Sequence, residues 1–252
     1  KFFSLYLLMA IGLKGGFALQ HSASGGSVFT TLSAAVIMAT LTPLLAFFML
    51  RKWINAYNAA AIAATYGSIS AVTFITAVAF LEKIGTSFDG YMVAAMALME
   101  SPAIIVGVFL ANKYGGSSKH ESIEWKPLLQ DAFLNGSVVL ILGSLLIGYL
   151  ADIEYEAALK PFTTDLFKGM LCFFLLDMGL ASARRIKILR KTAKLAVSFG
   201  IGFALFSGLL GLGLAYFLGL SAGNALLFTL LCGSASYIAV PAAMRIAVPQ
   251  AN

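Results

Sequence analysis

Long apolar runs, interrupted by short polar or Pro- and Gly-containing segments, extend along almost the whole chain. They predict membrane-spanning helices near residues 2–13, 28–50, 56–81, 91–112, 132–150, 166–183, 195–219 and 223–244. About 20 helical residues cross the roughly 30 Å of hydrocarbon in a bilayer, so the first run is an incomplete span. The pattern therefore predicts an all-α, polytopic membrane protein, divided by the polar segment 113–127.

Lysine and arginine fall mainly in alternate connections between the predicted helices. Of the 17 basic residues, one side receives 13 and the other receives 4, namely Lys14, Lys83, Lys160 and Lys168. Because positively charged loops remain in the cytoplasm, this bias predicts a cytoplasmic segment 113–127 and a multi-pass protein of the inner (plasma) membrane. The basic cluster at 184–194 is interpreted as a topology signal near anionic lipid; the alternatives are a docking surface for an acidic regulator and a nucleic-acid patch.

The sequence contains an internal repeat. The segment NAAAIAATYGSISAVT, beginning at Asn58, aligns without gaps on NALLFTLLCGSASYIA, which begins 166 residues later at Asn224. The loop assignment directs the two copies oppositely across the membrane, and an inverted pair requires an odd number of helices in each repeat. We therefore predict two inverted five-helix repeats, with about eight of the ten helices in this chain. The first repeat is 1–112 and lacks its first helix, 113–127 is a cytoplasmic linker, and the second repeat is 128–252 and lacks its last helix.

In each copy of the repeat, a glycine and two serines interrupt an apolar run. The candidate substrate-binding residues are Gly67, Ser68, Ser70, Gly233, Ser234 and Ser236. Glycine relaxes a helix, and serine hydroxyls bind freed backbone groups or a ligand. Two oppositely directed broken helices bring two positive half-helix ends together, which favours a small anion. The alternative is that these are small residues at a helix crossing.

Helix dipoles and a co-bound cation remain to neutralise a buried anion, because no lysine or arginine lies in the middle of a predicted span. Hydroxyl and carbonyl oxygens suit sodium as the coupling ion, although they do not select sodium over a proton. The candidate cation-binding residues are Ser70, Thr73, Glu100 and Ser236. Glu100 is an acid inside a span, followed by a proline that leaves backbone acceptors unpaired; its alternative role is a hydrogen-bonded structural acid. Asp177 is interpreted as a partner of the basic cluster.

The composition disfavours soluble enzymes, nucleic-acid binders and disordered regulators, because 60% of the residues are hydrophobic, 11% are charged and the mean hydropathy is +0.91. No nucleophile, base and orienting group assemble into a catalytic site, so we expect no enzyme and no catalytic residue. His21 and His120 lack partners at metal-ligand spacing, so we expect no metal site and no cofactor. Cys172 and Cys232 are predicted to be buried small apolar residues.

Five segments resemble a known family: IGLKGGFAL at 11–19, YGSISAVTFITA at 66–77, ALMESPAIIVGVFLAN at 97–112, GLASARRI at 179–186 and GSASYIAVPAAMRIAVPQAN at 233–252. The family is the sodium-dependent bicarbonate transport family of permeases, known from cyanobacterial carbon uptake. The resemblance implies ten helices in core and gate domains, a homotrimer, and import of bicarbonate with sodium. It also implies a substrate region at Ser68, Ser70, Ser234 and Ser236. Some members have an aspartate where this chain has Tyr237, and some bind a cytoplasmic regulator of the PII type.

Inverted repeats favour a secondary transporter, because two related halves can present one site to each side of the membrane in turn. We therefore expect sodium-coupled import of bicarbonate by alternating access, within a lipid bilayer and without nucleic acid as a partner. One alternative is a permease for another small anion with sodium or proton coupling. A second alternative, from a different class, is a membrane sensor or scaffold that does not transport.

Overall fold

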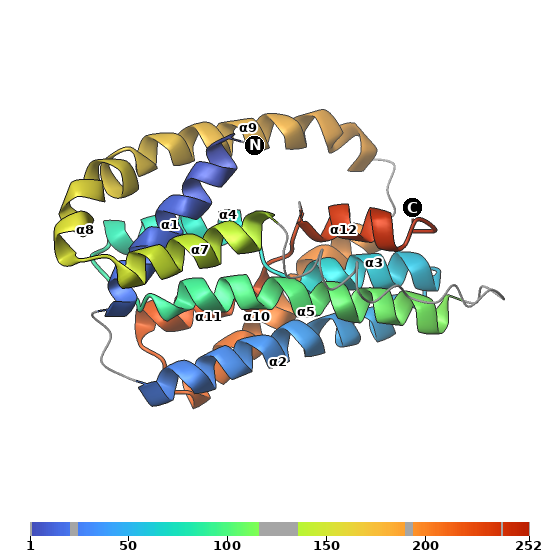
Figure 1. Ribbon diagram of the computed structural model, residues 1–252. Coiled ribbons are helices and arrows are strands. Elements are labelled where there is room, and N and C mark those ends of the chain that lie inside the picture. Colours follow the sequence, from blue (N-terminus) through green and yellow to red (C-terminus); the bar gives the residue numbers. More distant parts are fainter. Residues whose placement is uncertain (1, 21–24, 116–135, 190–193, 238, 252) are drawn as a thin grey trace.

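All regular elements of the described residues are helices (Figure 1). The structure, a computed structural model, describes residues 2–20, 25–115, 136–189, 194–237 and 239–251. The elements are α1 (Phe2–Gln20), α2 (Gly25–Leu50), α3 (Ala56–Gly67), α4 (Ala71–Lys83), α5 (Tyr91–Tyr114), α7 (Gly136–Leu150), α8 (Ile153–Lys160), the π-helix η1 (Pro161–Asp165), α9 (Phe167–Leu189), α10 (Lys194–Phe217), α11 (Ala222–Gly233) and α12 (Ala239–Ala247). The predicted all-helical fold class is confirmed.

Five helical stretches within the described residues are long and apolar enough to cross a membrane: Phe2–Gln20, Val28–Leu50, Ala56–Lys83, Tyr91–Tyr114 and Val197–Phe217. The other three predicted spans correspond to α7, to α9 and to α11 with α12. Helix α5 continues through Tyr114, into the predicted linker 113–127. The rest of that linker lies outside the described residues, as do His21, His120 and residues 190–193 of the basic cluster.

Two of the predicted spans are helices broken near their middle. Helix α3 ends at Gly67 and α4 begins at Ala71, whereas α11 ends at Gly233 and α12 begins at Ala239. Both first halves contain 12 residues, and their bounds differ by the 166 residues found in the sequence repeat. Each also begins with a polar cap: Asn55 Oδ1 accepts from the Asn58 amide at 2.8 Å, and Ser221 Oγ accepts from the Asn224 amide at 3.5 Å. The sequence repeat is therefore also a repeat of local structure.

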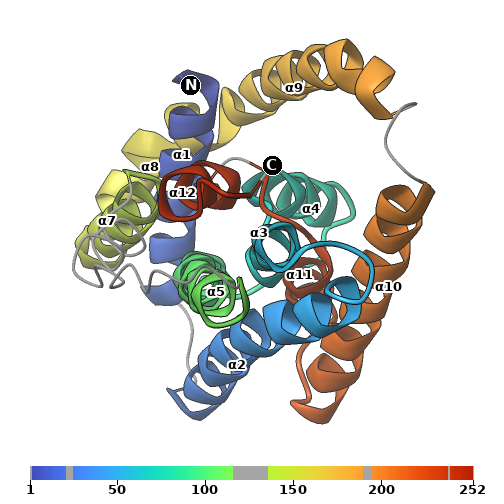
Figure 2. The same ribbon diagram turned by 90° about the vertical axis from the view of Figure 1, so that its right-hand side faces the viewer.

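The helices form two groups that share one hydrophobic core. One group contains α1, α7 and α9, and the other contains α2, α3, α5, α10 and α11 together with the halves α4 and α12. Helices α9 and α10 lie at the periphery of the bundle (Figure 2). Cys232 is buried as predicted, but the prediction for Cys172 is wrong, because that residue is exposed on α9. A peripheral helix leaves one face for lipid, and an apolar sequence does not distinguish that face from a protein core.

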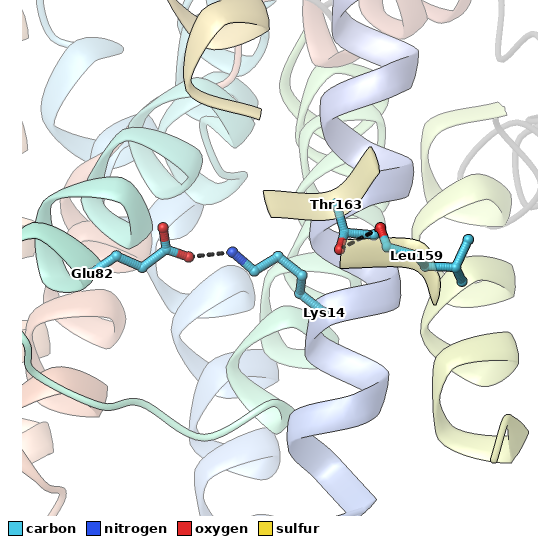
Figure 3. A network of polar contacts seen from close by, with 4 residues as sticks. All are labelled: Lys14, Glu82, Leu159 and Thr163. Carbon is cyan, nitrogen blue, oxygen red and sulfur yellow. Dashed lines mark hydrogen bonds and ion pairs between the residues drawn. The ribbon is translucent and has the colours of Figure 1, made fainter. Parts of the chain in front are cut away.

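The predicted end of the first span at residue 13 is also wrong. Helix α1 continues through Lys14 and two glycines to Gln20. Lys14 Nζ forms an ion pair with the Glu82 carboxylate near the end of α4 (Figure 3). It also lies 5.4 Å from the centroid of the Phe167 ring. These contacts place the ammonium between helices, so the lysine does not end the helix. The ion pair also joins the two helix groups.

Glycines allow α1 and α7 to approach closely. A Cβ atom added at Gly148 would overlap the carbonyl oxygen of Leu13, whereas one added at Gly143, also on α7, would meet nothing within 4 Å. We expect Gly148→Ala to lower the free energy of unfolding by about 1–3 kcal/mol, the usual cost of overpacking. Gly143→Ala should leave it unchanged or raise it by up to about 1 kcal/mol, because alanine favours helix. Unfolding midpoints of the two purified variants in one detergent test this, and equal midpoints would contradict the observed α1–α7 packing.

Candidate functional site

The two broken helices cross at their breaks. The Ser70 amide donates a hydrogen bond to Ser234 Oγ at 3.0 Å, and the Ser236 amide donates to the Thr65 carbonyl oxygen at 2.8 Å. Helix α12 contacts α3 while α11 contacts α4, so the first half of each broken helix lies beside the second half of the other. The two therefore pass each other in opposite directions (Figure 1).

Serines cap the second halves of both broken helices. Ser70 Oγ accepts from the Thr73 amide at 3.2 Å and from Thr73 Oγ1 at 2.9 Å. Ser236 Oγ accepts from the Val240 amide at 3.3 Å. The first amides of a helix have no acceptor within that helix and carry the positive end of its dipole. The N-terminal ends of α4 and α12 therefore give the crossing a positive potential without a basic side chain.

A large cavity opens beside the crossing, towards α9 and α10. Its volume is about 700 Å³, and most of its wall is apolar, including Met178, Leu205 and Leu209. Its polar lining residues are Ser70, Thr73, Thr229, Ser234 and Tyr237. An apolar cavity with a few polar groups at one wall is typical of a small-ligand site.

A second, smaller cavity brings Glu100 next to the crossing. It has a volume of about 60 Å³, and its polar lining residues are Ser4, Ser70, Glu100, Ser236 and Tyr237. The side chains of Glu100, Ser70 and Ser236 are 4%, 6% and 6% exposed. A single water needs roughly 10–15 Å³ of such space, so the cavity has room for an ion and a few waters. Ser70 and Tyr237 line both cavities, which therefore meet at the crossing.

Two predicted site residues, Gly67 and Ser68, line neither cavity. A Cβ atom at Gly67 would lie 2.5 Å from Pro43 Cγ, and one at Gly233 would lie 3.0 Å from Gly208 Cα. Both glycines therefore allow a neighbouring helix to approach, as the small-residue interpretation expects. Ser68 is fully buried, and its Oγ has no hydrogen-bond partner among the described residues. Thr73 lines the large cavity and not the one that contains Glu100.

A sequence comparison identifies the family of the chain. The profile described as the Na⁺-dependent bicarbonate transporter superfamily matches residues 1–252. The chain belongs to this superfamily. It is therefore a multi-pass membrane transporter and not an enzyme, and the family resemblance inferred from its motifs is confirmed. No match was found among curated proteins.

Three side chains at or near the crossing of this transporter were not predicted. Thr229 lines the large cavity with a buried Oγ1 that has no hydrogen-bond partner among the described residues. Its only sequence signal is its position one helical turn before Gly233. Tyr237 lines both cavities. From the sequence it was noted only as the position where some members of the family that the chain resembles have an aspartate. Ser4 reaches the small cavity from α1, which the sequence pattern did not associate with the crossing.

Two residues singled out in the sequence lie away from both cavities: Asn224, which begins the second copy of the repeat, and Asp177. Asn224 is buried and positions α11: its Oδ1 accepts from the Asp89 amide at 2.8 Å, and its Nδ2 donates to Tyr91 Oη at 3.0 Å. These bonds connect the start of α11 with the start of α5. Asp177 is exposed on α9 and lines neither cavity.

Proposed function

We propose that this superfamily member is a secondary active transporter that imports bicarbonate together with sodium by alternating access. The observation that supports this most strongly is the meeting of two helix N-termini at Ser70 and Ser236, beside the buried Glu100. Helix N-termini attract an anion, and a carboxylate with hydroxyl groups attracts a hard cation. The crossing offers both kinds of site within one short stretch of structure.

In this proposal the anion occupies the large cavity at the wall formed by the breaks. Ser70, Ser234 and Thr73 supply hydroxyl groups there, and the N-terminal amides of α4 supply the positive potential. Bicarbonate has both donor and acceptor oxygens, so it matches serine and threonine hydroxyls, which also donate and accept. Ser68 lies in the break between α3 and α4 but does not line this cavity.

Sodium occupies the small cavity, with Glu100 as its charged ligand and the hydroxyls of Ser70 and Ser236 as neutral ligands. Opposite unit charges about 5 Å apart attract by about 3 kcal/mol at an effective dielectric constant near 20. This attraction means that each bound ion would strengthen binding of the other, and such mutual strengthening is the thermodynamic requirement for coupling. Ser70 lines both cavities and is the neighbour that the two ions share. Thr73 contributes by fixing the Ser70 hydroxyl.

Alternating access requires movement between two bodies. The antiparallel broken helices, and the constant offset of 166 residues between the bounds of α3 and α11, support two inverted five-helix repeats. The two helix groups support a gate and a core. The Lys14–Glu82 ion pair would then connect gate and core on the side predicted to be external, beside a cavity of about 660 Å³. A homotrimer, the plasma membrane and a cytoplasmic PII-type regulator belong to the same proposal.

Another small anion, or proton coupling, is the second candidate. It is favoured by Tyr237, which provides no carboxylate where some family members have an aspartate, and which lines both cavities. In that case Glu100 would carry the proton, and the large cavity would accept a different anion. The non-transporting sensor or scaffold differs from both in binding a ligand without moving it.

Uptake into proteoliposomes distinguishes these candidates. Labelled bicarbonate should enter faster with an inward sodium gradient than with an equal potassium gradient, at constant pH and membrane potential. Unlabelled nitrate, formate and acetate should compete less well than unlabelled bicarbonate. Uptake that is driven by a proton gradient and does not depend on sodium would favour the second candidate. Binding of bicarbonate without uptake would favour the non-transporting sensor or scaffold.

A further inference from the structure

A cluster of basic and aromatic side chains lies where α2 and α5 end, away from the crossing. Arg51 follows the last residue of α2, and its Cζ lies 4.5 Å from the centroid of the Tyr114 ring. It also lies 5.6 Å from the Phe47 ring and 5.8 Å from the Phe48 ring. A guanidinium group over several rings is held in place by cation–π attraction. Arg51 is therefore oriented before any ligand arrives.

An open groove runs from this guanidinium along α2. Its volume is about 450 Å³, and it is lined by Leu45, Phe48, Met49, Arg51 and Lys52. Two cationic groups thus lie at one end of an apolar wall, and none of the described residues that line the groove is acidic. Within the described part of the chain, the lining of the groove therefore does not neutralise these two positive charges.

The apolar wall continues down α2 beyond the groove. Ile37 and Leu41 are 59% and 41% exposed, and they lie two turns and one turn before Leu45 on the same face of the helix. The stripe from Ile37 to Phe48 extends roughly 16 Å at about 1.5 Å per residue. Trp53, which is 57% exposed, lies just beyond the cationic end. A tryptophan next to the end of an apolar helix is typical of the boundary between the hydrocarbon and the headgroups of a bilayer.

We propose that Arg51 and Lys52 bind the phosphate of an anionic phospholipid whose acyl chain lies along Leu45, Phe48 and Met49. A soluble anion would use the two charges and leave the apolar wall uncovered, whereas a phospholipid matches both parts. The charge bias along the chain predicts that this end faces the cytoplasmic leaflet, where anionic lipids attract basic residues. The proposal does not depend on which anion the transporter carries.

The purified full-length chain in phosphatidylcholine nanodiscs with increasing phosphatidylglycerol provides the test. Lipid retained by the protein is measured by native mass spectrometry, and the unfolding midpoint is recorded in parallel. We expect Arg51→Gln combined with Lys52→Gln to weaken phosphatidylglycerol binding about 30-fold. This factor corresponds to about 2 kcal/mol for two charges, at 1.4 kcal/mol per factor of ten.

Two controls keep the test specific. Lys83→Gln combined with Lys168→Gln removes the same charge from exposed lysines outside the groove and should leave phosphatidylglycerol binding within about twofold. Arg51→Lys with Lys52 intact keeps both charges and should retain most of the binding, which excludes a folding defect as the cause of the loss. Equal losses in the two double variants would overturn the proposal. The proposal would also be overturned if inorganic phosphate alone raised the unfolding midpoint as much as phosphatidylglycerol does. A second copy of the chain that covers the groove, with no effect of phosphatidylglycerol, would overturn it as well.

Discussion

Replacing Ser70 or Ser236 with alanine is expected to weaken ligand binding by roughly five- to 150-fold, chiefly of the anion for Ser70 and of sodium for Ser236. Each serine lies at a helix N-terminus at the crossing, lines the small cavity and is 6% exposed. Removing the Ser70 hydroxyl leaves the anion short of a hydrogen bond, and removing the Ser236 hydroxyl leaves sodium short of an oxygen ligand. Either loss is worth about 1–3 kcal/mol, and 1.4 kcal/mol corresponds to a factor of ten. The two losses need not add, because both residues would contact one ligand assembly. Binding to the purified protein and uptake into proteoliposomes measure the effect.

Ser221→Ala is the matched control for this prediction. Ser221 also caps a half-helix, because its Oγ accepts from the Asn224 amide, but it is exposed and lines neither cavity. All three variants should lose about 1 kcal/mol of stability through the lost cap. Only Ser70→Ala and Ser236→Ala should lose affinity. Near-normal affinity in both variants would mean that these serines only cap helices, and that the paired motifs are small residues at a helix crossing.

Replacing Glu100 with glutamine is expected to lower the apparent affinity for sodium by about ten- to 150-fold. Glutamine keeps the shape of the side chain but removes the charge, and interactions with a charged group contribute about 1.5–3 kcal/mol. At saturating sodium the affinity for bicarbonate should change less than threefold, because the anion is bound by helix ends and hydroxyls. Uptake rates measured against sodium concentration, at several fixed bicarbonate concentrations, separate the two effects.

The same variant distinguishes the alternatives for Glu100. If the coupling ion is a proton, Glu100→Gln should remove the dependence of uptake on external pH and leave the response to sodium unchanged. If Glu100 is a structural acid, the variant should lose thermal stability and all binding together. An unchanged sodium half-saturation in a folded variant would place the cation elsewhere.

The sequence predicted the architecture well where local chemistry decides it. Glycine and serine interrupt the apolar runs at Gly67 and Gly233, and both helices end at these residues. The candidate cation ligands were predicted from residue type, and the structure brings Ser70, Ser236 and Glu100 to one cavity. Equivalent positions in a repeat carry this information, because they imply equivalent depths in the membrane.

Features that depend on tertiary contact were not predictable. Lys14 continues α1 because Glu82 and Phe167 receive its ammonium group, and nothing near Lys14 in sequence indicates those partners. Residues 151–165 were expected to connect two spans, yet most of them form α8 and η1. The roles of Thr229 and Tyr237 depend on the position of α10 and on the crossing of two distant breaks. Apolar pattern identifies helices, but it does not specify which faces meet.

Sodium-driven accumulation of bicarbonate against its own gradient tests the central claim most directly. Proteoliposomes are loaded with labelled bicarbonate at the same concentration inside and outside, with pH and membrane potential clamped. Protein-free liposomes in parallel report the leak through carbon dioxide. A tenfold inward sodium gradient stores about 1.4 kcal/mol per ion, which allows up to about tenfold accumulation with one sodium per bicarbonate. We predict net accumulation above the protein-free level that disappears when potassium replaces sodium; bicarbonate that stays level under the sodium gradient would contradict the account.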